Sequence, residues 1–166
     1  NKIIKNVKFK HDILFIDDHS TDGTKDVINK IKSKNILFIN RKKKLGIGSA
    51  HKFGIKYAYK HRYRYIITMD CDGTHDPKII KKMLLKLKKF ELVNTNRFIK
   101  QDSLSDWPIY RKMLTYTRHY LVKFFLNISY DSSGGFRCYN SKKLKIKHIN
   151  NLLTKKIQKT KNVKIY

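Results

Sequence analysis

Two pairs of carboxylates follow short apolar runs in this sequence. Asp17 and Asp18 stand after one such run, and Asp70 and Asp72 stand after residues 65–69. Side chains two positions apart on an extended strand leave it on the same face, so Asp70 and Asp72 can converge on one cation. Mg²⁺ or Mn²⁺ suits carboxylate oxygens, and Mg²⁺ commonly takes its other ligands from water and the phosphates of a substrate.

Spacing alone leaves three interpretations of the segment Asp70-Cys71-Asp72 open. The first is the metal site. The second is a general acid and base, but a glycosidase needs carboxyl groups about 5 Å or more apart on opposite sides of the bond it cleaves, which this spacing does not naturally give. The third is turn capping, since Asp-x-Asp-Gly is also ordinary turn chemistry.

Two further loops contain residue types that suit a nucleotide. The polar loop at residues 17–24 offers acceptors for a base or ribose and hydroxyls for helix capping, and taken alone it favours capping. Gly46 and Gly48 permit close backbone approach ahead of a predicted helix N-terminus, where phosphate binds well. A single G-x-G does not by itself establish such a site.

The pattern around these residues predicts strands that alternate with helices. Such alternation implies an α/β fold with a mainly parallel sheet covered by helices on both faces, and ligands bind such sheets beyond the carboxyl ends of the strands. Both acidic pairs are expected at those ends. Strands are predicted at residues 13–16, 36–39, 65–69 and 92–95, and helices around residues 27–31, 47–57, 79–87 (started by Asp76 and Pro77) and 109–126, the last with a stripe of Met113, Tyr116, Tyr120 and Phe124.

The composition predicts one globular domain with an anionic partner. The chain has 166 residues, 39 basic and 12 acidic, with a net charge of +27. Nucleic acid, an acidic membrane surface and a phosphorylated ligand would each satisfy this charge, whereas many of the lysines can also be only solvated surface. Cys71 and Cys138 lack metal-ligand spacing and are expected to be free thiols in a reducing compartment.

The two ends of the chain carry separate expectations. We expect the first strand of the fold to precede Asn1. After residues 132–135 the chain changes character, and the apolar positions from Leu144 to Ile157 predict a basic amphipathic helix. No apolar run approaches the roughly 18 to 20 residues that a membrane-spanning helix needs.

Taken together, six stretches resemble the dolichol-phosphate or polyprenol-phosphate mannosyltransferases within glycosyltransferase family 2. The resemblance implies a Rossmann-like GT-A fold, with residues 1–140 as the catalytic core, N-terminally incomplete. Residues 141–166 would be a basic amphipathic segment, part of the same domain or apposed to a membrane. The stretches are ILFIDDHSTDGT, KKLGIGSAHKFGIKYA, YIITMDCDGTHDP, ELVNTNRF, WPIYRKMLTYTRHYL and YDSSGGFRCYN, in the family's order and approximate spacing.

The resemblance also implies roles for individual residues. Asp70, Asp72 and Thr74 are assigned as ligands of Mg²⁺ or Mn²⁺. The family often has Gln or Ser at the position of Thr74, so water can take the place of Thr74 as a ligand. Binding of the nucleotide sugar is assigned to Asp17, Asp18, Ser20, Asp22, Lys44, Gly46, Asp70 and Cys71. Catalysis is assigned to Asp72 and to three arginines that would face phosphates, Arg97, Arg111 and Arg137, each of which could instead be a solvated side chain.

The implied reaction is transfer of mannose from GDP-mannose to a dolichyl or polyprenyl phosphate with inversion at the anomeric carbon. The protein would be cytoplasmic and peripheral on the cytosolic face of a membrane. The family's P-x-Y-N-E strand, which helps hold the base, is not in this sequence, so the nucleotide is less defined. The alternatives are another family 2 transfer, such as glucose from UDP-glucose, an inactive relative, or a nucleic-acid-binding module; no signature of that last class is present, and no nucleic acid is expected.

Overall fold

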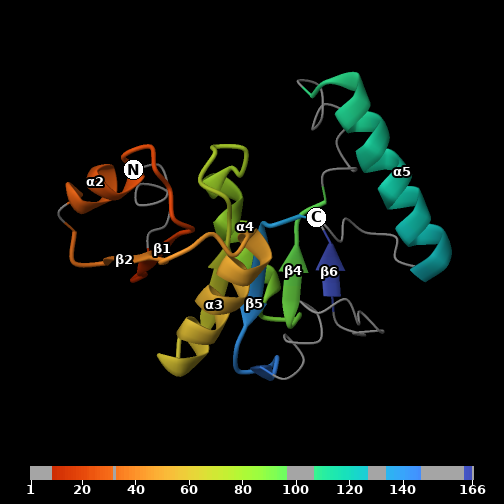
Figure 1. Ribbon diagram of the computed structural model, residues 1–166. Helices are drawn as coiled ribbons and strands as arrows, with labels where there is room; N and C mark the ends of the chain where they lie inside the picture. The colour runs from red at the N-terminus through yellow and green to blue at the C-terminus, as the bar shows by residue number, and fades with distance from the viewer. Residues whose placement is uncertain (1–8, 32, 97–106, 127–133, 147–162, 166) are drawn as a thin grey trace.

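The computed structural model describes residues 9–31, 33–96, 107–126, 134–146 and 163–165. Strands and helices alternate from the start of this region to β4, as the sequence predicts (Figure 1). The elements are β1 (Ile13–Asp17), α2 (Thr24–Asn29), β2 (Ile36–Asn40), α3 (Ile47–Lys60), β3 (Tyr65–Thr68), the 3-10 helix η1 (Pro77–Ile79), α4 (Ile80–Lys86), β4 (Leu92–Asn94), α5 (Ile109–Leu126), β5 (Arg137–Asn140) and β6 (Val163–Ile165).

The described strands form two sheets. In the first, β1 and β2 pair in parallel, with Ile13 opposite Ile36 and Asp17 opposite Asn40. The second has the order β3-β5-β4-β6, in which β4 and β6 are parallel and β5 is antiparallel to both of its neighbours. The α/β class is confirmed, and the parallel strands β3 and β4 are joined through one strand of opposite direction that the sequence pattern did not predict.

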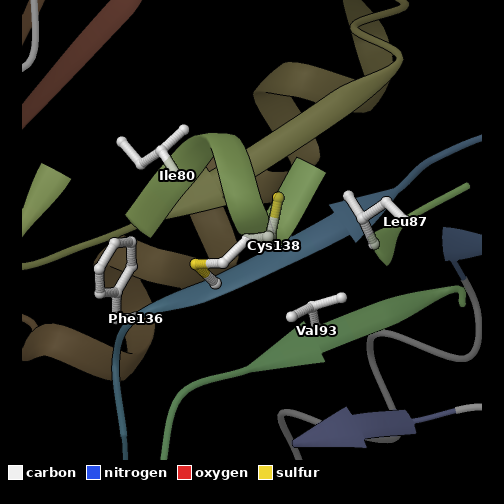
Figure 2. Close-up of a cluster of buried hydrophobic side chains, with 6 residues drawn as sticks. Ile80, Leu87, Val93, Phe136 and Cys138 are labelled. Atoms are coloured by element: carbon white, nitrogen blue, oxygen red, sulfur yellow. The ribbon is translucent and has the colours of Figure 1, made fainter. Parts of the chain in front are cut away.

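Helices cover both faces of the second sheet. Val93 of β4 pairs with Cys138 of β5, and both pack in a cluster with Met83 and Leu87 from the α4 region (Figure 2). The neighbouring pair in the register, Leu92 and Tyr139, points the other way and packs in a cluster with Ile55 of α3. The sheet is therefore held between α4 on one face and α3 on the other.

Helix α3 also lies very close to the first sheet. A Cβ atom on Gly54 would come within 2.8 Å of the Ile16 Cδ1 atom, so a larger residue there would require the end of the Ile16 side chain to move. Gly46 precedes α3 with a φ of +85°, a conformation that L side chains rarely adopt. Gly46 therefore permits the backbone turn at the start of α3, and Gly54 lets the middle of the helix pack closely on Ile16 of β1.

Two predicted helices differ from the structure or fall outside it. α2 ends at Asn29, so Ile31, which the pattern placed in the same helix, lies beyond it and is exposed. The amphipathic helix predicted from Leu144 lies mostly in residues 147–162, outside the described residues; Leu144 itself is buried in the α3 cluster. Asp76 caps η1 by accepting from the Lys78 N–H, with Pro77 in the first turn, as predicted.

Candidate active site

The Asp18 carboxylate ties the end of β1 to the segment that enters α3. It accepts backbone N–H hydrogen bonds from Leu45 at 3.0 Å and from Gly46 at 2.6 Å, and it pairs with Arg41 at 3.0 Å. Hydrogen bonding from the Leu45 N–H lowers the pKa of Asp18, with further contributions from Gly46, Arg41 and Lys44. The predicted nucleotide residues Asp18, Lys44 and Gly46 thus lie together.

The other carboxylates of this loop, Asp17 and Asp22, accept hydrogen bonds from residues two or three positions further along the chain. Asp17 is buried, and its carboxylate accepts from the backbone N–H and the hydroxyl of Ser20. Asp22 accepts from the hydroxyl and the backbone N–H of Thr24, and these bonds lower the pKa of Asp22. These bonds shape local turns in the loop, whereas the predicted helix capping is not observed: the N-cap of α2 is Gly23 and makes no side-chain hydrogen bond.

The start of α3 carries the Asp18 carboxylate on the Gly46 N–H and has no side-chain cap of its own. Gly46 has no side chain to cap the helix. Lys44 is exposed close by. Free N–H groups at the start of a helix of 14 residues attract a phosphate through direct bonds and the helix dipole.

Asp72 lies in a tight turn after β3. Its Oδ1 atom accepts from the Thr74 hydroxyl at 2.6 Å and from the Thr74 backbone N–H at 3.0 Å, and the hydroxyl bond is the main cause of the lowered pKa of Asp72. Gly73 between them has a φ of +84°. The turn-capping interpretation is thus correct for Asp72, and the Thr74 hydroxyl points at Asp72; a metal role for either residue stays a prediction.

Asp70 has a different setting, between two histidines. His51 Nε2 of α3 lies 3.7 Å from one carboxylate oxygen, and His75 Nε2 lies 3.8 Å from the other. The Asp70 backbone N–H donates to His75 Nδ1 at 2.9 Å. Gly135, which precedes β5, approaches so closely that a Cβ atom there would lie 3.1 Å and 3.2 Å from the two carboxylate oxygens.

Sequence patterns did not identify His51, His75 or Gly135. The three come from separate segments that only the fold brings together, and the single available signal was the position of His75 five residues after Asp70. Burial is the main cause of a lowered pKa for His51, so its neutral form is favoured beside Asp70.

The structure describes two of the three arginines that were predicted to face phosphates. Arg137 begins β5 opposite Thr68, donates from Nε to the Gly134 carbonyl at 2.8 Å, and lies near enough to His51 to act on it electrostatically. Arg111 stacks its guanidinium 3.9 Å above the Trp107 ring at the start of α5. Arg97 lies outside the described residues.

The carboxylate chemistry of Asp70 and Asp72 suits a hard cation, and the two residues stay the predicted ligands. Asp70 and Asp72 supply oxygen atoms, and the Asp70 side chain is 29% exposed. Within residues 9–31, 33–96, 107–126, 134–146 and 163–165, no group of three His, Cys, Asp or Glu side chains is arranged to hold an ion. Two carboxylates with the remaining positions left to water and phosphate are typical of Mg²⁺ sites that act on nucleotides.

A family model described as glycosyl transferase family 2 matches residues 2–149. The chain belongs to this family. The α/β architecture is that of its GT-A fold, with the carboxylates Asp18 and Asp70 at the ends of β1 and β3.

The domain is similar to two curated relatives. It is 27% identical over 137 residues to an undecaprenyl-phosphate mannosyltransferase of Micrococcus luteus, covering 81% of this chain and 56% of the relative. It is 26% identical over 132 residues to a polyprenol monophosphomannose synthase of Mycolicibacterium smegmatis, covering 76% of this chain and 50% of the relative. The chain spans about half the length of these relatives.

The two cysteines of the family 2 domain are free thiols, as predicted. Cys71 is an exposed residue between Asp70 and Asp72; partial desolvation of its thiol, followed by the charge of the two carboxylates, raises its pKa. Cys138 is buried in β5, where burial raises its pKa to about 12. The predicted metal ligands are oxygens, which a hard cation such as Mg²⁺ prefers over sulfur.

Proposed function

We propose that this domain transfers mannose from GDP-mannose to a polyprenyl or dolichyl phosphate. The observation that carries the proposal is the coverage of most of the chain by relatives named for mannosyl transfer to such lipids. The site supports it, because the start of α3 and the carboxylates after β3 suit a nucleotide diphosphate and its cation.

The chain's own residues would divide the work between the donor and the acceptor. The Asp17-Asp18 loop would meet the nucleoside, while Lys44 and the N–H groups of α3 would bind phosphate oxygens. Asp70 and Asp72 would hold Mg²⁺ or Mn²⁺. When bound, that ion supplies positive charge that stabilises a departing nucleoside diphosphate.

The acceptor chemistry explains why no general base is assigned. A lipid phosphate is already an anion near neutral pH, so it can attack the anomeric carbon directly and invert its configuration. The obstacle is repulsion between two anions, which the guanidinium groups of Arg111 and Arg137 would offset.

We further propose peripheral attachment to an anionic membrane through α5. The helix contains no acidic residue and carries Arg111, Lys112, Arg118 and Lys123. Its apolar stripe is exposed rather than packed: Phe124 is 82% exposed. No helix in the described ranges is both long and apolar enough to span a bilayer. An exposed apolar face flanked by basic residues suits the interface between head groups and acyl chains.

A transfer assay on the full-length protein tests the proposal. Labelled GDP-mannose, a short polyprenyl phosphate and Mg²⁺ or Mn²⁺ should give a mannosyl lipid, and EDTA should abolish it. Asp72→Asn should lower turnover at least about a hundredfold, as for removal of other groups that stabilise transition-state charge. Asp76→Asn is the matched control, because Asp76 only caps η1 and asparagine caps as well.

Other outcomes select the alternatives. Transfer from UDP-glucose but not GDP-mannose would replace the donor while keeping the reaction class. Transfer by Asp72→Asn at the wild-type rate would remove the metal assignment. Failure with every donor would favour an inactive relative that only binds sugar nucleotide.

A further inference from the structure

We propose that His51, His75 and Gly135 form a socket that fixes the orientation of the Asp70 carboxylate, and that both histidines are positioning residues for cation binding. This inference rests on the proposed function, since it assigns supporting residues to the proposed metal site. The socket is assembled from α3, the loop after β3 and the segment before β5.

His75 connects Asp70 to the hydrophobic core. Its Nδ1 atom accepts the Asp70 backbone N–H at 2.9 Å, and its ring stacks on Phe136 with centroids 4.9 Å apart. Phe136 is 1% exposed and belongs to the cluster built on α4, β4 and β5. The backbone of Asp70 is therefore anchored through one aromatic stack to a rigid part of the fold.

The carboxylate is confined on its remaining sides. His51 lies 3.7 Å from Oδ1, and the α-carbon of Gly135 approaches so closely that one added methyl group would crowd both oxygens and His51 Cε1, at 3.1 to 3.2 Å. The Gly135 carbonyl is itself held by the Thr68 hydroxyl at 2.7 Å. Side-chain rotation of Asp70 is limited from three directions.

Confinement leaves the Asp70 oxygens available to a ligand. The two imidazoles lie 3.7 and 3.8 Å from the Asp70 oxygens, farther than the backbone N–H groups of Leu45 and Gly46 lie from the Asp18 carboxylate. A ligand oxygen that is held in place but not already bonded loses little orientational freedom when a cation binds. Such supporting residues typically change metal affinity by about 10- to 100-fold.

The test compares variants of His75 that keep or lose the acceptor. His75→Asn retains an acceptor at the δ position, whereas His75→Leu has similar bulk and none. Titration of the full-length protein with Mn²⁺ alone, followed by the EPR signal of the free ion, should show a dissociation constant at least about tenfold higher for His75→Leu. His75→Asn should stay near the wild-type value.

Two further variants test the other walls of the socket. Gly135→Ala and His51→Leu should also weaken Mn²⁺ binding, because each changes a contact with the carboxylate. His61→Leu is the matched histidine control, since His61 lies at the far end of α3 and stacks only on Tyr57 among the ring contacts described. Thermal unfolding of every variant checks that folding is retained.

Asp70→Asn separates failure of the socket from failure of the metal site. If Asp70→Asn loses Mn²⁺ while His75→Leu binds like the wild type, the socket is wrong and the metal site stands. If the wild type binds no Mn²⁺, or if Asp70→Asn binds Mn²⁺ as tightly as the wild type, both the socket and the metal site fall. Independently of metal, long-range ¹H–¹⁵N spectra should show His75 with an unprotonated Nδ1; a proton on Nδ1 would overturn its role as acceptor.

Discussion

Carboxylates at the ends of β1 and β3 serve different purposes at the residue scale. Asp18 is saturated by donors from Leu45, Gly46 and Arg41, so it shapes the protein and does not offer free oxygens to a cation. At Asp70, by contrast, the nitrogens of His51 and His75 lie 3.7 and 3.8 Å from the carboxylate oxygens. The same residue type therefore has two roles. In the first loop, Asp18 holds Leu45, Gly46 and Arg41 together, an arrangement called the Asp18 clip below, whereas Asp70 is a candidate ligand.

Removal of the Asp18 clip should weaken binding of the donor. Asp18→Ala frees the backbone of Leu45 and Gly46, so the start of α3 loses the geometry that presents its N–H groups. We expect the dissociation constant for GDP-mannose, measured by calorimetry, to rise severalfold without loss of the fold. Asp26→Ala, which removes an exposed carboxylate of α2, is the control; equal affinities in the two variants would contradict a role for the clip.

The pKa of Asp18 gives this clip a defined pH dependence. Hydrogen bonding lowers the pKa below the ordinary 3.8, so the contribution of Asp18 is complete above 3.8 and is lost as the pH falls through the lower pKa of the folded protein. Donor affinity through this residue should therefore be flat from about pH 6 to about pH 8.

Sequence patterns predicted the positions of both carboxylate pairs but not the environment of Asp70. An apolar run followed by two acids is local information: β1 ends at Asp17, and β3 ends at Thr68, two residues before Asp70. His51, His75 and Gly135 meet only because α3 and β5 lie on either side of the loop, and no spacing in the chain encodes that meeting. Ordinary turn chemistry at Asp72 was one of the open alternatives and is present.

At the scale of elements, strand β5 shows why some elements cannot be predicted from the sequence pattern. Its four residues, Arg137 to Asn140, include two polar side chains and so do not form an apolar run. They form a strand because β3 and β4 offer hydrogen-bonding edges on both sides. Longer periodic segments, such as α3 and α5, were predicted close to their observed ranges, since their own pattern specifies them.

The exposed face of α5 leads to a prediction at this scale. Replacing both Phe124 and Phe125 by serine should reduce binding to anionic vesicles, because each fully buried aromatic side chain contributes roughly 1.5–3 kcal/mol. Flotation of the full-length protein with liposomes measures the effect. Leu85→Ser, which removes an exposed apolar side chain from α4, should bind like the wild type. Unchanged flotation of the double variant would show that α5 is not the attached face.

At the scale of the whole molecule, the charge of +27 had several interpretations in the sequence. The positions of the charged residues in the fold favour some of these interpretations over others. Four acidic residues, Asp17, Asp18, Asp70 and Asp72, lie at strand ends, whereas α5 contains only basic charge. A nucleic acid backbone would be repelled by those strand ends, while a phosphate that arrives with a cation would not.

The whole-molecule charge predicts how attachment should respond to salt. Basic residues near an anionic membrane each contribute roughly 1 kcal/mol, and this contribution decays over the Debye length, which falls from about 10 Å at about 0.1 M salt to about 3 Å at about 1 M. Vesicle binding of the full-length protein should therefore drop steeply over this range and should be weak on neutral lipid at any salt. The Phe124 and Phe125 variant should show the same salt slope as the wild type with weaker binding throughout, because the apolar contribution is not screened. Equal binding to neutral and anionic lipid would instead show that attachment depends on apolar insertion alone. The positive charge would then serve to bind the phosphates of the substrates.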